Sequence, residues 1–328
     1  MSEPLDLSSA PAAVRNELAT LRAALDAQVP SRQMDRNLLI ATWNIRSFGG
    51  LTEKWASGDN DSPKRNFRGL AAIAEIISRF DVVALQEIIG DLKALRTLMK
   101  TLGPDWNFIL TDTNTGSKGN NERSGYIFDS RRVRLSGLAG ELSAPDDEAF
   151  LAALSPDAPF RQFARTPYAV SFRSGGHTFI LVTAHVIFGD SASDRTGELR
   201  AIGQWLADWA DRTKRFHQNL LLLGDFNIDR RGDANYDAFV AAGLETPDAL
   251  NAAPRSIFGA RDGSEKFYDQ IAWFTSGEGR ALTMEFMSAG SFDFSTLLFQ
   301  ASPKLTKRSM SFRVSDHLPL WAEFKAAG

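Results

Sequence analysis

The stretch LLLLGDFNID, residues 220–229, joins a run of apolar side chains to a group of polar ones within a few positions. Leu220 to Leu223 form an unbroken apolar run, which is typical of a β-strand buried on both faces. After Gly224 the chain places Asp225, Asn227 and Asp229 two positions apart. The ordinary interpretation is a turn, because Asp, Asn and Gly are common where strands stop. The alternative is that this strand delivers a carboxylate and an amide to a functional site.

Four other apolar segments meet polar residues at one end in the same way. LLIATW (38–43) is followed by Asn44, DVVAL (81–85) by Gln86 and Glu87, and TFILVTA (178–184) by His185, whereas LPLWAEF (318–324) is preceded by Asp316 and His317. A turn explains one polar strand end, but five ends with residues suited to metal and phosphate chemistry favour a site. In α/β proteins, ligands collect at strand ends because loops there carry the chemistry while the strands hold them rigid.

Each of these residues also has an ordinary interpretation of its own. Asn44 alone is typical of a turn, and Glu87 alone is typical of a solvated position where the chain reaches the surface. His185 and His317 each lie against apolar neighbours, where a hydrogen-bonded core histidine is the alternative. The chain's other two histidines are interpreted as a hairpin residue (His177) and an exposed residue at a helix end (His217). Only the joint pattern favours a site.

Apolar residues at helical spacing predict helices over residues 12–27, 70–80 and 199–209. Long apolar strands with helices between them indicate an α/β layer structure. In the first helix, Val14, Leu18, Leu21 and Leu25 form one apolar face, which predicts an amphipathic helix laid on the main body or on a partner. We therefore divide the chain into an N-terminal helix and linker (residues 1–36) and a main domain (residues 37–328).

The composition restricts the chemistry that the chain can perform. There is no cysteine, so any metal must be held by oxygen or imidazole ligands, and a cysteine nucleophile is excluded. The formal net charge of -3 gives no overall attraction to nucleic acid, so a polyanion would need a local basic patch. No run of about 18 apolar residues is present, which argues against a membrane-spanning helix. The N-terminal stretch lacks the pattern of a secretory signal, and we expect a cytoplasmic protein.

Eight stretches of the sequence, taken in order, resemble the endonuclease/exonuclease/phosphatase superfamily, on its deoxyribonuclease I-like side. They are TWNIR, LQEI, ERSGYIFDSRRV, ARTPYAVSF, TAHVIFGD, LLLGDFNID, FYDQIAW and SDHLPL, and all of them lie within residues 38–324. GDFN and SDH are weak signals individually, whereas eight matches in order are strong. The resemblance implies two mixed β-sheets packed face to face, with helices on the outer faces and a site along one edge of the sandwich. Residues 37–328 would then be the catalytic domain.

The resemblance also implies a role for each matching residue. The Mg²⁺ or Mn²⁺ ligands would be Glu87, Asn44 and Asp316, since hard divalent ions prefer oxygen ligands. Asp225 and Asn227 would orient the attacking water and the phosphate. Two catalytic histidines would each be supported by a carboxylate, His185 by Glu122 and His317 by Asp269. Because Glu122 falls in the polar tract 111–125, which we expect to be a surface loop, its contact is expected to be the less fixed. An arginine, Arg165, would contact phosphate.

Two departures from the family pattern bear on the substrate. Gln270 follows Tyr268-Asp269 where many relatives carry arginine, and Ile88 and Ile89 follow Glu87 without the lysine of the apurinic-site repair members. The second departure argues against the repair branch. The resemblance thus favours a nuclease that cuts DNA, rather than RNA, with little sequence specificity. The alternatives are hydrolysis of a phosphorylated small molecule or lipid headgroup, and a catalytically silent binding module.

Basic residues occur near several of the motifs. They are Arg46, Lys64, Arg65, Arg68, Arg123, Arg131, Arg132, Arg134, Lys304, Lys307, Arg308 and Arg313. If several shared one rim of the site, they would supply phosphate contacts independent of sequence. An ordinary solvated surface is the alternative.

Overall fold

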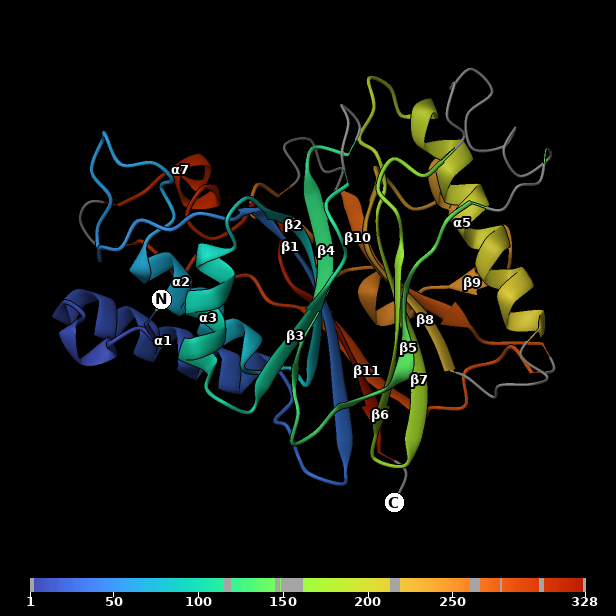
Figure 1. Ribbon diagram of the computed structural model, residues 1–328, viewed down its shortest axis with the longest axis horizontal. Coiled ribbons are helices and arrows are strands. Elements are labelled where there is room, and N and C mark those ends of the chain that lie inside the picture. Colours follow the sequence, from blue (N-terminus) through green and yellow to red (C-terminus); the bar gives the residue numbers. More distant parts are fainter. Residues whose placement is uncertain are drawn as a thin grey trace.

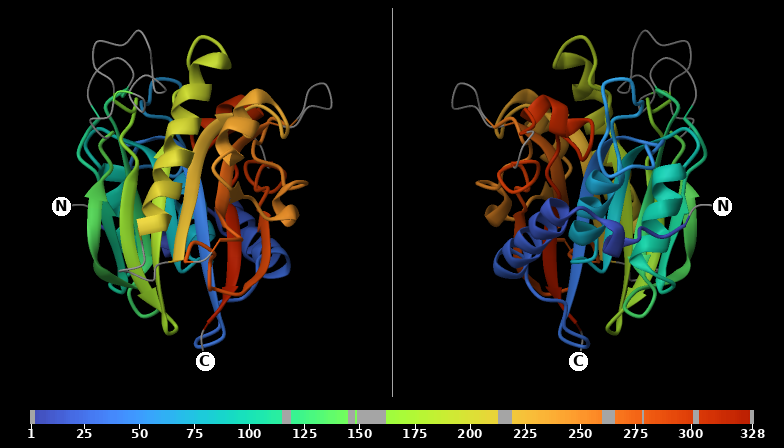
Figure 2. Two further views of the ribbon diagram at one scale, coloured as in Figure 1. Left: turned by 90° about the vertical axis from the view of Figure 1, so that its right-hand side faces the viewer. Right: turned by 90° about the vertical axis from the view of Figure 1, so that its left-hand side faces the viewer.

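The computed structural model describes residues 3–114, 119–144, 148, 162–212, 219–259, 266–277, 279–300 and 304–326. His217, predicted to be exposed at a helix end, lies outside these ranges. The described part contains two mixed sheets of six strands, with helices on both outer sides (Figures 1 and 2).

The first sheet has the strand order β11–β12–β1–β2–β4–β3. Its strands are β1 (Asn37–Phe48), β2 (Val82–Ile89), β3 (Trp106–Leu110), β4 (Glu122–Asp129), β11 (Phe286–Ser291) and β12 (Leu320–Lys325). The second sheet has the order β5–β6–β7–β8–β10–β9. Its strands are β5 (Arg134–Glu141), β6 (Tyr168–Ser174), β7 (His177–His185), β8 (Asn219–Ile228), β9 (Leu244–Glu245) and β10 (Phe267–Phe274).

Each sheet has one parallel pair at its centre, β1 with β2 and β7 with β8, and its other pairs are antiparallel. Helices α2 (Phe67–Ile77) and α5 (Ser193–Arg212) lie within the two crossover connections. The remaining helices are α1 (Ala12–Gln28), α3 (Lys93–Leu102), α6 (Ala234–Val240) and α7 (Lys307–Ser311), with short 3-10 turns at η1 (Leu7–Ser9) and η3 (Asp248–Leu250). A parallel pair requires such a crossover. Because both strands of a pair run in the same direction, their carboxyl ends, which carry the polar residues, lie side by side at one end of the sheet.

The apolar run of β8 packs on both sides of its sheet. Leu221 and Leu223 belong to the core between the two sheets, and Leu220 and Leu222 belong to the core beneath α5 and α6. Strand side chains alternate between faces, so an unbroken apolar run is what a strand covered on both sides requires. The predicted fold, two packed sheets with outer helices, is confirmed.

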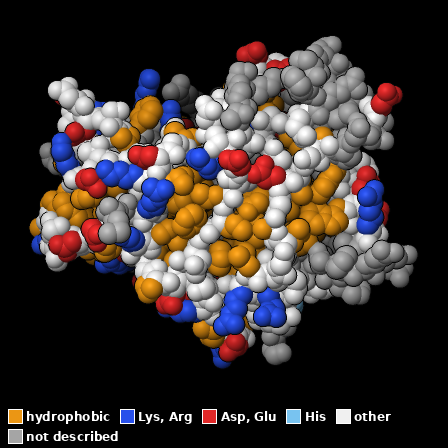
Figure 3. Space-filling model, in the orientation of Figure 1, with side chains coloured by type: hydrophobic (Ala, Val, Ile, Leu, Met, Phe, Trp, Pro, Cys, Tyr) orange, Lys and Arg blue, Asp and Glu red, His pale blue; other side chains and the backbone are white. Residues whose placement is uncertain are grey.

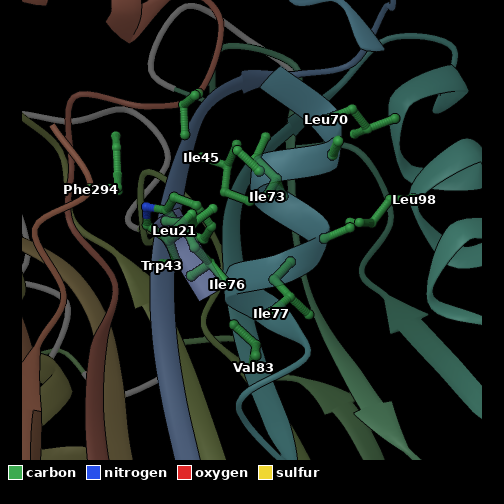
Figure 4. Packing of buried hydrophobic residues seen from close by; sticks show 14 of the residues in the cluster. Leu21, Trp43, Ile45, Leu70, Ile73, Ile76, Ile77, Val83, Leu98 and Phe294 are labelled. Carbon is green, nitrogen blue, oxygen red and sulfur yellow. The ribbon is translucent and has the colours of Figure 1, made fainter. Parts of the chain in front are cut away.

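The outer face of the first sheet is covered by α1, α2 and α3. Figure 4 shows Ile73, Ile76 and Ile77 of α2 close to Trp43 of β1 and Val83 of β2. The face of α1 predicted from the spacing joins the same core, because Val14, Leu18, Leu21 and Leu25 are all buried there. The N-terminal helix therefore lies on the main body. The division of the chain at residue 36 remains a prediction.

The polar residues expected after the strands lie inside them instead. Strand β1 continues past Asn44 to Phe48, β2 includes Glu87, and β8 includes Asp225 and Asn227. The pairing of these strands does not stop at the polar residues. It shifts register after Asn44 in β1 and after Leu85 in β2 and then resumes, so the strands continue. Glu87 and Asn227 adopt left-handed backbone angles (φ 59° and 51°), which turn their side chains at the site edge.

Gly224 is a glycine near the site whose backbone requires the absence of a side chain. Its φ is 145°, and a Cβ atom there would lie 2.0 Å from the carbonyl oxygen of Ala184 in the neighbouring strand β7. Glycine thus permits the close approach of β7 and β8 directly before His185 and Asp225, which are paired in register.

On the face that Figure 1 presents, Figure 3 shows hydrophobic side chains gathered over the middle of the molecule, where β3 and β4 lie. Phe108 of β3 is among the exposed apolar residues of the described chain. None of the described helices is both long and apolar enough to cross a membrane.

Candidate active site

A cleft of about 650 Å³ lies where the irregular ends of the central strands meet. It is lined by Arg46, Ser47, Glu87, Ile89, Asn120, Glu122, Arg165, His185, Phe188, Asp225, Asn227, Ser256, Phe258, Tyr268, Asp316 and His317. Both sheets contribute residues, because β1, β2 and β4 belong to the first and β7, β8 and β10 to the second. The cleft therefore lies across the edge of the sandwich.

His317 forms a buried pair with Asp269 of β10. The distance from His317 Nδ1 to Asp269 Oδ2 is 2.7 Å, and the Asp269 side chain is fully buried. Burial raises the pKa of Asp269 to about 6. Burial also opposes the charge of His317, but Asp269 and Asp225 outweigh this effect and raise the pKa of His317 well above its usual value. The two carboxylates therefore favour the protonated form of His317.

His185, the last residue of β7, forms the corresponding pair with Glu122. Its Nδ1 lies 2.9 Å from Glu122 Oε2, and Arg165 Nε lies 2.6 Å from the same oxygen. Burial disfavours the charge of Glu122, but the hydrogen bond with His185 and the charges of His185 and Arg165 outweigh it and lower the pKa of Glu122. The expectation that Glu122 lies in a surface loop was wrong. It is the buried first residue of β4, and its backbone pairs with Ile89 of β2.

Asp225 lies between the two histidines. Its Oδ2 is 3.6 Å from His185 Nε2 and 3.7 Å from His317 Nε2. The side-chain amide of Asn44 donates to the same oxygen at 2.9 Å, and the backbone N–H of Asn227 donates to Oδ1 at 3.0 Å. Burial opposes the charge of Asp225, but both histidines and these donors outweigh it and lower its pKa. Two histidines that are 132 positions apart in the sequence thus face one carboxylate oxygen.

Asn227 is fixed by its own side chain. Its amide donates to the carbonyl oxygen of Val186 at 2.8 Å, one residue beyond His185. This bond, together with the backbone bond from Val186 N–H to the carbonyl oxygen of Asp225, ties the ends of β7 and β8 together. The structure therefore places Asp225 and Asn227 of the opening stretch in the cleft, whereas Asp229 pairs with Arg195 and Lys266.

The three predicted metal ligands lie in the cleft or directly beside it. Glu87 accepts a hydrogen bond from the Asn44 amide at 3.0 Å through Oε1 and one from the backbone N–H of Ser47 at 2.8 Å through Oε2. The Oδ1 atom of Asn44 is buried and has no hydrogen-bond partner in the described chain. Asp316 is 3.2 Å from the guanidinium group of Arg46.

These donors fit a hard divalent ion that keeps several of its waters. Mg²⁺ takes one or two carboxylates and amide oxygens in this way, and the unpartnered Asn44 oxygen beside the Glu87 carboxylate supplies both ligand types. Within the described ranges, no three His, Asp or Glu side chains come together as a complete metal cage. The residues therefore suit a partly hydrated ion better than zinc held by protein ligands alone.

Several of the predicted basic residues are engaged in contacts within the fold. Arg131 binds Asp129 and Asp105, and Arg132 binds Asp81, at the end of β4 opposite to Glu122. Arg65 is buried and donates to backbone carbonyl oxygens, and Arg68 is paired with Glu17 of α1. These arginines hold the fold together because each is paired with a carboxylate or carbonyl oxygen. Of the predicted basic residues, Arg46 lines the cleft.

Sequence reasoning did not assign a role to several residues of the cleft. Phe188, Phe258 and Tyr268 line it, and the rings of Tyr268 and His317 have centroids 5.9 Å apart. Phe188 and Tyr268 lie within the quoted motifs TAHVIFGD and FYDQIAW, which was the available signal. Phe258 lies outside every motif, so only the fold could reveal it.

Comparisons with known proteins agree with this geometry. The model of the Endonuclease/Exonuclease/phosphatase family matches residues 41–284. A deoxyribonuclease of Thioalkalivibrio sp. (strain K90mix) is 28% identical over 298 residues, which cover 88% of this chain and 71% of that protein.

Two solved structures share the fold. A mannosyl-6-phosphatase of Bacteroides thetaiotaomicron VPI-5482 is 17% identical with a TM-score of 0.59, over 88% of this chain and 99% of that one. TDP2 of D. rerio, complexed with a single-strand DNA product, is 16% identical with a TM-score of 0.55, over 88% and 98%. At such identities the likeness concerns the fold alone.

Proposed function

The chain belongs to the Endonuclease/Exonuclease/phosphatase family, and from that premise we propose that it is a divalent-metal-dependent phosphodiester hydrolase that cuts DNA with little sequence specificity. The observation that carries the proposal is the convergence of two histidine–carboxylate pairs on Asp225. The named deoxyribonuclease among the relatives supports DNA as the substrate.

Each pair presents one ring nitrogen to the cleft. A carboxylate on Nδ1 fixes the tautomer and orientation of the imidazole and leaves Nε2 facing the reacting group. The imidazolium of His317 is suited to donating a proton to a phosphoryl or leaving oxygen. Asp225, an ionised carboxylate between both rings, is suited to orienting the attacking water and accepting its proton.

Arg165 and Asn227 would hold the phosphate. Arg165 is anchored to Glu122, and its Nη1 atom is buried without a hydrogen-bond partner in the described chain, so an N–H donor remains for a phosphate oxygen. A divalent ion held by Glu87, Asn44 and Asp316 would neutralise phosphate charge and polarise the P–O bond.

A plasmid-nicking assay with Mg²⁺ or Mn²⁺, repeated with EDTA, tests the proposal. We expect metal-dependent nicking that His317→Gln abolishes and His177→Gln leaves unchanged, since His177 begins β7 at the end remote from His185. A panel of phosphomonoesters and phospholipid headgroups is run beside it. Turnover of one of these without any cleavage of DNA or RNA would replace the nuclease proposal with the small-molecule alternative.

Binding of nucleic acid without turnover in any arm of the assay would instead favour a silent binding module. The complete set of paired histidines and carboxylates argues against that outcome, because a binding module has no need to hold two histidines against buried carboxylates.

A further inference from the structure

Exposed phenylalanines are concentrated at the cleft. Of the four exposed phenylalanines in the described ranges, Phe188 (57% exposed) and Phe258 (40%) line the cleft, and Phe312 packs on Arg46, which also lines it. The fourth, Phe108, lies on β3 and does not line the cleft. Exposed large apolar side chains beside a polar site are informative, because hydrolysis of a phosphate requires none of them.

Phe188 is held in place from below. The guanidinium group of Arg195 lies over its ring at 4.5 Å from the centroid and donates to the carbonyl oxygen of Phe188 at 2.7 Å. Arg195 is itself buried and fixed by Asn227 and Asp229. One face of the ring therefore lies on a fixed cation, while more than half of the residue is open to solvent. A ring that is held in place and exposed in this way offers a flat surface on which another ring can stack.

Phe258 is held on the segment that pairs with His317. Ser256 forms a β-bridge with His317, and the backbone N–H of Ile257 donates to the carbonyl oxygen of Asp316 at 2.9 Å. The N–H of Phe258 donates to Ser256 Oγ at 3.2 Å. Phe188 thus follows His185 by three positions, and Phe258 lies two positions after Ser256, which pairs with His317, so each ring lines the cleft on a segment tied to one of the histidines.

The overall charge of the chain gives no general attraction for a long polyanion. The net charge is -3, and Arg131 and Arg132 are occupied by carboxylates. Aromatic stacking is the other general source of affinity for nucleic acids, and it tolerates any sequence because every base has a flat face. In a duplex those faces are covered by neighbouring bases, so a ring at the rim can stack only on an unpaired base.

We propose that Phe188 and Phe258 are stacking platforms for the two bases that flank the scissile phosphate of an unpaired strand. This inference rests on the proposed function and specifies its substrate as single-stranded nucleic acid, or duplex that is locally opened. The phosphate occupies the polar centre of the cleft, and the bases on either side lie on the rings.

The test compares an oligothymidylate, a fully abasic strand of the same length and a duplex. Binding is measured by fluorescence anisotropy in EDTA, and cleavage is measured with Mg²⁺. The proteins are the full chain and its Phe188→Ala, Phe258→Ala, Phe188→Trp and Phe108→Ala variants. Phe108→Ala is the matched control, because it removes a ring that lies away from the cleft and is exposed to about the same extent as Phe258.

We expect Phe188→Ala and Phe258→Ala each to weaken oligothymidylate binding by roughly tenfold and to raise KM similarly, since one stacked base contributes on that scale. Neither variant should change binding of the abasic strand, Phe188→Trp should retain the wild-type affinity, and Phe108→Ala should match wild type throughout. The duplex should be the poorer substrate.

The inference is overturned if wild type binds the thymidine and abasic strands equally, or if both alanine variants behave as Phe108→Ala does. If cleavage is independent of the bases and of the two phenylalanines, the stacking role is refuted while the proposed nuclease activity is supported. If binding depends on the bases and on the two phenylalanines but no nucleic acid is hydrolysed, the stacking role is supported and the proposed nuclease activity is refuted.

Discussion

Replacing Asp269 with asparagine tests the chemistry of the cleft most directly, because the change removes one charge and almost no volume. The distance from Asp269 Oδ2 to His317 Nδ1 is 2.7 Å and the carboxylate is fully buried. Two unit charges at this separation attract by about 6 kcal/mol at an effective dielectric constant of about 20. Breaking a buried pair by removing one partner costs about 3–5 kcal/mol in practice.

The lower of these costs, about 3 kcal/mol, corresponds to a fall of about two units in the pKa of His317. In the wild type Asp269 and Asp225 raise the pKa of His317 well above its usual value, which favours the imidazolium. In Asp269→Asn the proton is lost at a lower pH than in the wild type, and the asparagine amide also favours the wrong tautomer. We expect the cleavage rate to fall by about 10²–10⁴-fold, the range that one positioned acid or base contributes.

The assay is single-turnover cleavage of an oligonucleotide at saturating Mg²⁺ from pH 5.5 to 9, with thermal unfolding measured in parallel. Asp129→Asn is the control, because Asp129 is equally buried and paired with Arg32 and Arg131, but at the end of β4 remote from the cleft. It should lose stability without losing rate. If Asp269→Asn cleaves within a few-fold of wild type with the same pH profile, the imidazolium of His317 has no part in the reaction.

Four further predictions follow from individual contacts. Glu87→Gln should shift the Mg²⁺ titration of cleavage to higher concentration with an unchanged unfolding midpoint, and an unaltered titration would remove Glu87 from the metal site. Arg132→Ala should lower stability through loss of its buried contact with Asp81 while leaving the salt dependence of DNA binding unchanged; a reduced salt slope would instead return Arg132 to the DNA-binding surface. Burial opposes the charge of Asp129, but its arginine partners outweigh this effect and lower its pKa. Its contribution to stability is therefore present above about pH 3.9 and is lost as the pH falls through the folded-state pKa. Asp129→Asn should reduce this loss of stability at acid pH, measured by urea unfolding. Leu21→Ala, at a fully buried position of α1, should cost about 2–5 kcal/mol by urea unfolding, and a negligible cost would mean that α1 adds little to the core.

Apolar spacing in the sequence was sufficient to predict strands and helices of an α/β layer structure, and the resemblance to the family implied the two packed sheets. The unbroken run of Leu220 to Leu223 requires a strand covered on both faces, and the structure places alternate leucines in two different cores. The helical spacing of Val14, Leu18, Leu21 and Leu25 likewise predicted the buried face of α1. Both signals are local periodicities, which a chain carries in its sequence because side-chain direction repeats within each element.

The site residues predicted from the motifs lie at the cleft, but several of them lie in a different element of secondary structure from the one expected. Asn44, Glu87 and Asp225 were expected after strands and lie inside them, and Glu122 was expected in a loop and begins β4. Such boundaries depend on which neighbouring strand continues the hydrogen bonding. That depends on residues distant in the sequence, as with the pairing of Glu122 with Ile89.

Tertiary structure alone decided which groups act on one another. The sequence separates His185 from His317 by 132 positions, and only the packing of two sheets brings both rings to one oxygen of Asp225. It equally decided that Arg132, basic in sequence, is neutralised by Asp81, and that Phe188, apolar in sequence, faces solvent on top of Arg195. The physical reason is that charge compensation and exposure are properties of a side chain's surroundings, and residues far apart along the chain supply those surroundings.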